Sequence, residues 1–111
     1  MAAVGSLRRF DVVLVTLDPT QGAEMRKTRP CVVISPDEVN LFSRTVVVAP
    51  LTTGSHAYPT RIACNFEGTA GHVVVDQLRA VDVARVVRRL GAIEADVAGQ
   101  VLAALQAFFA G

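Results

Sequence analysis

Short runs of β-branched apolar residues, each ended by a turn-forming group, are the feature that most constrains the fold of this chain. The first run, at 10–17 (FDVVLVTL), stops at the turn-forming residues 18–22 (DPTQG). Runs of this length, bounded by Gly, Pro, Asn or Asp, are typical of β-strands joined by loops. The same pattern predicts further strands at 31–35, 45–50, 60–66, 72–76 and 86–90, and a single helical turn at 36–40.

The segment 60–66 has the clearest strand periodicity. Ile62, Cys64 and Phe66 alternate with polar or small residues, which indicates a strand with one buried face. Residues 67–71 (EGTAG) then connect it tightly to the next strand, so a hairpin is expected here.

The end of the chain is different and predicts an amphipathic helix over 95–109. Its apolar residues recur at spacings of three and four, which puts them on one helical face. Gly91 and Glu94 suit the entry to this helix. The residues of the apolar face are Val97, Val101, Leu102, Leu105, Phe108 and Phe109.

Together these elements predict a mainly β fold of five or six short, mostly antiparallel strands with a C-terminal helix. Such an order favours a small curled β-barrel. The length of 111 residues fits one domain, 1–111, in which 1–8 is expected to be a flexible N-terminal tail. Because a barrel this small is filled by its own side chains, we expect the chemistry on its outer loops.

The composition excludes several classes of protein. Hydrophobic residues make up 51% of the chain and charged residues 19%, which argues against disorder. No apolar run approaches the roughly 20 residues of a membrane-spanning helix, and no signal peptide is recognisable. A cytoplasmic protein without a membrane partner is therefore expected. Cys31 and Cys64 are too few for a disulfide framework or a zinc site, and each fits a small buried apolar position.

The basic residues hint at phosphate binding, although the net charge is only +1. Of the 11 basic side chains all but Lys27 are arginine, and arginine suits bidentate phosphate contacts and stacking on bases. Polar groups also gather just after three predicted strands, where a barrel would present them at its rim. Converging arginine and hydroxyl donors there would suit a phosphate, but ordinary solvated loops explain the same pattern. The three groups are Thr20, Gln21, Glu24, Arg26, Lys27, Thr28 and Arg29; Thr52, Thr53, Ser55 and His56; and Asp76, Gln77 and Arg79.

Other chemistries find less support in the sequence. The ten acidic residues are scattered, whereas a metal-dependent nuclease needs clustered carboxylates, so neither a metal nor a cofactor is expected. His56 and His72 could act as an acid–base pair, but His72 begins an apolar predicted strand and His56 lies in a predicted loop, which argues against a joint role.

Three segments, in this order and with these intervals, resemble the motifs of the MazF/PemK toxins. The first is 17–24 (LDPTQGAE) continued by 28–36 (TRPCVVISP), with Asn40 beyond it. The second is 48–53 (VAPLTT), and the third is 71–79 (GHVVVDQLR) with Asp82. The likeness extends from about Arg9 to the final helix.

The resemblance implies an SH3-like β-barrel that dimerises and cleaves single-stranded RNA at short sequences. It also implies a cognate antitoxin whose disordered C-terminal segment lies over the RNA groove. Arg29 and Thr52 match the pair regarded as catalytic in many members. Glu24 and Asp76 match positions that support catalysis, and the expected RNA-binding residues are Thr20, Gln21, Lys27, Thr53, His56, Gln77 and Arg79.

Two positions depart from part of the family. Some relatives have a catalytic histidine where Ala23 stands and a catalytic arginine where Val74 stands. This chain therefore has to rely on Arg29 and Thr52, and Asp76 serves either catalysis or a structural hydrogen bond to a loop.

The implied reaction is attack of the RNA 2′-OH on the adjacent phosphorus, which leaves a cyclic phosphate and a 5′-OH end. Because guanidinium does not deprotonate at neutral pH, we assign Arg29 to the scissile phosphate rather than to proton transfer. Thr52 would donate a hydrogen bond to the same oxygens, and either Glu24 or His56 would be the base. Residues 55–60 and 68–72 are expected to set the target sequence, with Tyr58 either stacking on a base or packing over the barrel end.

Two alternatives are a non-catalytic gyrase-poisoning toxin on the same barrel and an SH3-like binding module. The first would not need Arg29 or Thr52, and the second expects an aromatic groove that 5% aromatic content makes poor. Phe108 and Phe109 are interpreted as core or dimer packing. The mean hydropathy of +0.42 agrees with a homodimer, because unburied apolar area often marks an interface.

Overall fold

The computed structural model describes residues 6–16, 27–53 and 58–110. Neither of the two α-helices in these ranges is long and apolar enough to cross a membrane. In chain order the elements are β1 (Asp11–Thr16), β2 (Thr28–Val33), α1 (Asp37–Phe42), β3 (Thr45–Thr52), β4 (Arg61–Phe66), β5 (Thr69–Val74), η1 (Val75–Gln77), β6 (Arg79–Asp82), η2 (Val83–Arg85), β7 (Val86–Ala92) and α2 (Ala95–Phe109).

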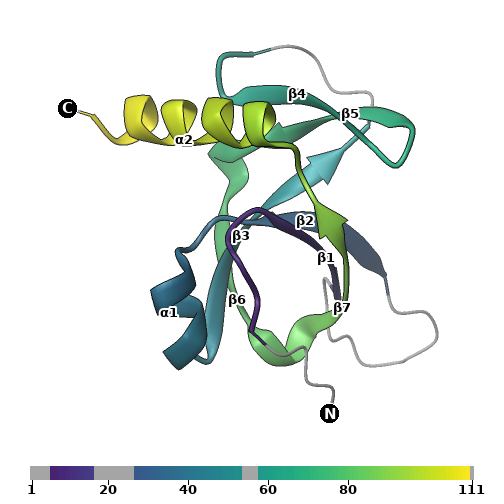
Figure 1. The fold of residues 1–111 in the computed structure, drawn as a ribbon, viewed down its shortest axis with the longest axis vertical. Helices are drawn as coiled ribbons and strands as arrows, with labels where there is room; N and C mark the ends of the chain where they lie inside the picture. Colours follow the sequence, from purple (N-terminus) through teal and green to yellow (C-terminus); the bar gives the residue numbers. More distant parts are fainter. Residues whose placement is uncertain (1–5, 17–26, 54–57, 111) are drawn as a thin grey trace.

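The strands form one curled sheet in which every pairing is antiparallel, in the order β4-β5-β3-β2-β1-β7 with β6 also paired to β3. Strand β3 is the centre of this arrangement because it changes partner along its length. Its first half, Thr45–Val48, pairs with β6, and its end, Leu51–Thr52, pairs with β5. The change lets β1, β2, β3, β6 and β7 curl into a half-barrel while β4 and β5 turn away beneath α2 (Figure 1). The expected mainly β, barrel-like fold is confirmed, with seven strands in the described ranges rather than five or six.

Each face of the sheet carries its own apolar cluster. Val12, Val32 and Val73 belong to the cluster under α2, and Val13, Val33 and Val48 fill the half-barrel. Neighbours along a strand thus point to opposite clusters, as the period of two in a strand requires. The alternation predicted for 60–66 is confirmed, since Ile62, Cys64 and Phe66 all pack into the cluster under α2.

Helix α2 has the predicted bounds and buries Val97, Val101 and Leu105 against the sheet. Phe108 and Phe109 in its last turn, interpreted as core or dimer packing, are not part of the core. Phe108 and Phe109 are 48% and 68% exposed, because the helix extends beyond the sheet there, and their rings contact each other edge to face.

The N-terminal segment is packed from Leu7 onward, so the tail expected at 1–8 does not reach that far. Leu7 is 4% exposed and belongs to the half-barrel cluster. The buried carboxylate of Asp11 fixes the segment, because it accepts a hydrogen bond from the Arg8 backbone N–H at 2.9 Å and pairs with Arg89 at 3.0 Å.

Two of the strands that extend beyond their predicted bounds run through a proline, Pro30 in β2 and Pro50 in β3. Strand β2 begins at Thr28 rather than after Pro30, and β3 continues past Pro50 to Thr52. At Pro30 only β1 lies beside β2, because the pairing of β2 with β3 begins at Cys31↔Pro50. A proline costs least where one side of the ladder is open. The prediction that Arg29 and Thr52 lie in loops is therefore wrong, since both belong to strand ends.

The hairpin of β4 and β5 is confirmed, and its turn is tighter than predicted. Phe66 pairs with Thr69, so Glu67 and Gly68 alone form the turn, with φ of 53° and 80°. Two successive positive φ angles define the type I′ turn that matches the twist of a hairpin. Asp76, predicted at the end of a strand, lies instead in the 3₁₀ turn η1.

Candidate active site

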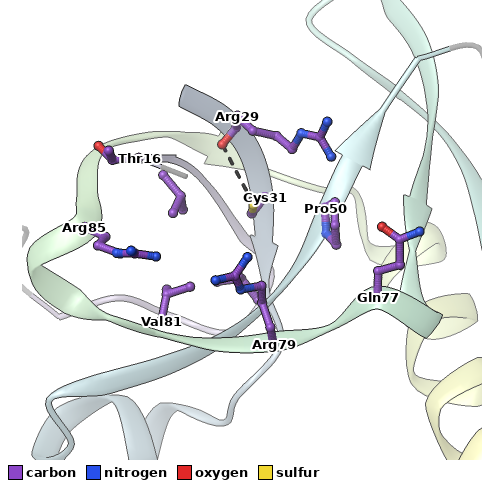
Figure 2. A pocket seen from close by; sticks show the side chains of 10 residues that line it. Thr16, Arg29, Cys31, Pro50, Gln77, Arg79, Val81 and Arg85 are labelled. Carbon is purple, nitrogen blue, oxygen red and sulfur yellow. Dashed lines mark hydrogen bonds between the residues drawn. The ribbon is translucent and has the colours of Figure 1, made fainter. Parts of the chain in front are cut away.

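The open side of the half-barrel holds a cavity of about 320 Å³ lined by three arginines. Arg29 comes from β2, Arg79 from β6 and Arg85 from η2, so residues far apart in the sequence meet here. Figure 2 shows the guanidinium groups of Arg79 and Arg85 turned into the same hollow, with that of Arg29 extending toward Pro50. We call this cavity the arginine pocket. Its remaining lining residues are Val15, Thr16, Cys31, Val48, Pro50, Gln77 and Val81.

The arginine pocket is built to attract an anion. Within the described ranges none of its lining residues is acidic, and none of its three arginines takes part in an ion pair there. Its floor is apolar, formed by residues such as Val15, Val48 and Val81, and an apolar floor strengthens the field of the cations above it. Converging guanidinium groups match the planar, bidentate geometry of a phosphate.

Cys31 lies in this pocket but is no nucleophile at neutral pH. Burial raises the pKa of its thiol to about 11, and the positive charges of Arg29 and Arg79 offset only part of that rise. Its Sγ atom makes a weak contact at 3.8 Å with the carbonyl oxygen of Arg29. The expectation of a small buried residue is confirmed at 4% exposure. Burial likewise raises the pKa of the half-buried Cys64.

Thr52 ends β3 close to this pocket. Cys31 on β2 pairs with Pro50 on β3. If this antiparallel register continued by two residues, Arg29 would lie opposite Thr52. The Oγ1 atom of Thr52 is buried and has no hydrogen-bond partner among the described residues. An unsatisfied buried hydroxyl costs about 1–3 kcal/mol, and such a group is suited to meeting a ligand oxygen.

Thr52 also depends on a close approach of the neighbouring strand β5. Thr52 pairs with His72, and a Cβ atom placed on the preceding residue, Gly71, would overlap the carbonyl oxygen of Thr52. Only glycine lets the two strands come together at this position.

Asp76 faces away from the arginine pocket and holds a neighbouring turn. Its Oδ1 atom accepts a hydrogen bond from the Thr60 hydroxyl at 3.0 Å and lies 3.8 Å from Nε of Arg61. The second distance makes an ion pair but is too long for a hydrogen bond, so Nε of Arg61 has no hydrogen-bond partner among the described residues. The Arg61 guanidinium in turn lies 4.8 Å from the ring centre of Tyr58. These contacts fit the structural role weighed for Asp76.

The predicted site residues are thus brought together only in part. Arg29, Gln77 and Arg79 share the arginine pocket, whereas Thr52 and Thr53 line a second cavity on the other side of the end of β3. Lys27 is exposed just before β2. Four residues lie outside the described ranges: Thr20, Gln21, Glu24 and His56.

Arg85 is the residue that sequence reasoning missed. It follows the segment Arg79–Asp82, which carries no strand pattern, and only the pairing of that segment with β3 brings Arg85 to the pocket. Among the described residues no three His, Cys, Asp or Glu side chains gather as a metal site would require.

Comparison with known protein families identifies the family of this fold. Residues 8–109 match the model of the PemK-like, MazF-like toxin of type II toxin–antitoxin systems. The chain belongs to this family. The match covers all the described elements of the PemK/MazF-type fold, including the three segments that carry Arg29, Thr52 and Gln77.

Individual relatives agree with this family assignment. The chain is 35% identical over 105 residues to the Escherichia coli protein named endoribonuclease PemK, over 89% of this chain and 79% of that protein. It is 32% identical over 114 residues to the Escherichia coli endoribonuclease toxin ChpB, over 96% and 97% of the two chains.

Solved structures agree with the fold. A crystal structure of MazF from Deinococcus radiodurans superimposes with a TM-score of 0.77 at 25% identity, covering 94% of this chain and 96% of that one. A mycobacterial endoribonuclease solved with its cognate antitoxin gives a TM-score of 0.79 at 20% identity, covering 92% and 93%.

Proposed function

We propose that this PemK/MazF-type toxin is an endoribonuclease that cleaves single-stranded RNA at specific short sequences without a metal ion. The observation that carries the proposal is the arginine pocket, where Arg29, Arg79 and Arg85 meet with no carboxylate among the described lining residues. Relatives at 32–35% identity are named endoribonucleases, which supports the same activity here.

The proposed reaction is an internal transfer. The 2′-oxygen forms a bond to phosphorus while the bond from phosphorus to the 5′-oxygen breaks, which leaves a cyclic phosphate and a 5′-OH end. Arg29 holds the scissile phosphate and stabilises its developing negative charge, and the free hydroxyl of Thr52 donates to the same oxygens. The general base takes the 2′-OH proton, and the departing 5′-oxygen takes a proton from water; we propose Glu24 as the base, with His56 as the alternative.

The remaining polar groups would bind the rest of the RNA. Gln77, Arg79 and Arg85 line the arginine pocket and would hold backbone phosphates, and the exposed Lys27 and Thr53 lie beside the strand ends. Thr20, Gln21 and His56 are proposed as further RNA contacts. Asp76 is proposed as a structural residue, because its carboxylate holds the turn at Thr60.

The partners follow from the same proposal. A MazE–MazF complex from Deinococcus radiodurans, 25% identical with a TM-score of 0.79, is a relative solved with its antitoxin. We propose that a cognate antitoxin covers the arginine pocket of this chain with a disordered C-terminal segment. We also propose that the toxin acts as a homodimer in the cytoplasm.

The test is cleavage of a long single-stranded RNA and of the matching DNA by purified protein in excess EDTA. The proposal predicts discrete cuts in RNA only, with 5′-OH ends, and protection of any site that carries a 2′-deoxy sugar at the cut. Thr52→Val removes the free hydroxyl while keeping the side-chain shape, and should slow cutting strongly. Thr45→Val removes an exposed hydroxyl at the far end of the same strand and serves as its control. Cutting of DNA, or activity that requires a divalent cation, would contradict the proposal.

A further inference from the structure

A second cavity, of about 240 Å³, lies beside Thr52 on the other side of the end of β3. We call it the Glu67 pocket. It lies between the ends of β2 and β3, the tip of the β4–β5 hairpin and strand β7. The residues that matter for its chemistry are Pro30, Leu51, Thr52, Phe66, Glu67 and Leu90.

The walls of the Glu67 pocket suit one flat apolar ring. Its volume falls below the roughly 300–1,000 Å³ of pockets for drug-sized ligands, so it has room for a single ring system. Pro30, Leu51 and Leu90 supply aliphatic walls, and Phe66 supplies an aromatic one. Unstacked bases of single-stranded RNA are held against such aromatic side chains.

The absence of a side chain at Gly91 leaves room for the Phe66 ring against β7. A Cβ atom on Gly91 would lie 3.2 Å from Cζ and 3.3 Å from Cε1 of that ring, so any side chain there would displace it. The ring therefore rests directly on the backbone of β7, which fixes one wall of the pocket.

The charge of the Glu67 pocket is opposite to that of the arginine pocket. Glu67 is the single ionisable side chain among its described lining residues. A carboxylate repels a phosphate and only accepts hydrogen bonds, so it selects a group that carries N–H donors. The turn itself does not explain a glutamate, because a type I′ turn with φ of 53° at this position prefers Asn, Asp or Gly.

We propose that the Glu67 pocket binds a base next to the scissile phosphate and that Glu67 selects bases with an exocyclic amino group. The ring stacks on Phe66, and the carboxylate accepts from the amino group of guanine, cytosine or adenine. Uracil is excluded because its single ring N–H lies between two carbonyl oxygens that repel the carboxylate. The inference rests on the proposed RNA cleavage and adds a specificity-determining residue to it.

The test is sequencing of the fragments that the toxin produces from a single-stranded RNA library randomised over the target region. Wild-type protein should disfavour uracil at one position beside the cut by roughly tenfold, the size expected for loss of one good base contact. In Glu67→Gln the amide both donates and accepts, so this discrimination should fall to about twofold or less. Glu38→Gln removes an exposed carboxylate on α1 and should leave the base preference unchanged.

Binding gives a second measurement that does not depend on the rate of cutting. RNA oligonucleotides blocked by a 2′-deoxy sugar at the cut, with uracil or an amino-bearing base at the same position, should show the same change in affinity ratio. A base preference that is identical in wild type and Glu67→Gln would overturn the inference while leaving the proposed function intact. A wild-type protein that cuts no RNA would overturn the proposed function itself.

Discussion

The two pockets beside the end of β3 differ in charge and in shape. The arginine pocket is larger, with three guanidinium groups over an apolar floor, and the Glu67 pocket is smaller, with one carboxylate beside an aromatic ring. Phosphate contacts position a nucleic acid and base contacts specify its sequence. On the proposed function, the two tasks fall on either side of the end of β3, with phosphates in the arginine pocket and a base in the Glu67 pocket beside Thr52.

The largest effect should come from the close approach of β5 to the end of β3 at Thr52. Gly71→Ala would force a Cβ atom into the carbonyl oxygen of Thr52 and push β5 away from β3. We expect a loss of about 1–3 kcal/mol of unfolding free energy, as for other overpacked sites, and a large loss of cleavage. Thermal or urea unfolding together with the cleavage assay measures both.

Gly99→Ala is the matched control for this change. Nothing lies within 4 Å of a Cβ atom at Gly99, which sits on the exposed side of α2. It should gain about 0.5–1 kcal/mol of stability, because alanine favours a helix more than glycine. Equal stability and equal cleavage in the two variants would show that the close approach at Thr52 does not matter.

An intermediate effect is expected from the arginines that do not lie next to Thr52. Arg79→Ala and Arg85→Ala should each weaken RNA binding uniformly across sequences and leave the base preference unchanged. Each lost phosphate contact should lower the slope of log affinity against log salt by about 0.7, the value for single strands. Titration of a non-cleavable RNA over a salt series, with the exposed Arg88→Ala as control, measures this slope.

A changed base preference without a changed salt slope in Arg79→Ala or Arg85→Ala would break the comparison. It would mean that the arginine pocket reads bases instead of holding phosphates.

The smallest effect concerns the turn that carries Glu67. Asparagine tolerates the left-handed conformation better than glutamate, so Glu67→Asn should stabilise the protein by about 0.5–1 kcal/mol. The shorter side chain should at the same time relax the discrimination against uracil. A thermal melting curve, measured together with the library assay, would show whether Glu67 lowers the stability of the turn while increasing base specificity. A Glu67→Asn variant that is less stable than wild type would argue that Glu67 has a structural role.

Much of the fold follows from local patterns in the sequence. The spacing of Val97, Val101 and Leu105 predicted the bounds of α2, because a long amphipathic helix carries a strong periodic signal. The alternation at 60–66 likewise gave β4 and its buried face. Arg29 and Thr52 could be singled out because the family motifs place them, although both were assigned to loops.

The rest depended on contacts that are distant in the sequence. Pro30 and Pro50 suggest strand ends locally, yet each lies where one side of the ladder is open, so the strands continue through them. Strand β6 has only four residues and forms because Val81 pairs with Val46 on β3, so no local pattern predicts it. The position of Arg85 in the arginine pocket depends on this pairing and could not be predicted either. The Glu67 pocket escaped prediction for the same reason, since its described lining residues come from five strands and the turn of one hairpin.

The most direct test of the account is the rate of RNA cleavage in EDTA by Arg29→Ala compared with Arg88→Ala. Both variants lose one arginine from the sheet, but only Arg29 lines the arginine pocket. The account predicts that Arg29→Ala cuts roughly a hundred- to a thousandfold more slowly than wild type, the usual cost of losing one group that stabilises the transition-state charge, and that Arg88→Ala cuts at nearly the wild-type rate. Equal rates for a folded Arg29→Ala and the wild type would contradict the assignment of this pocket to the scissile phosphate.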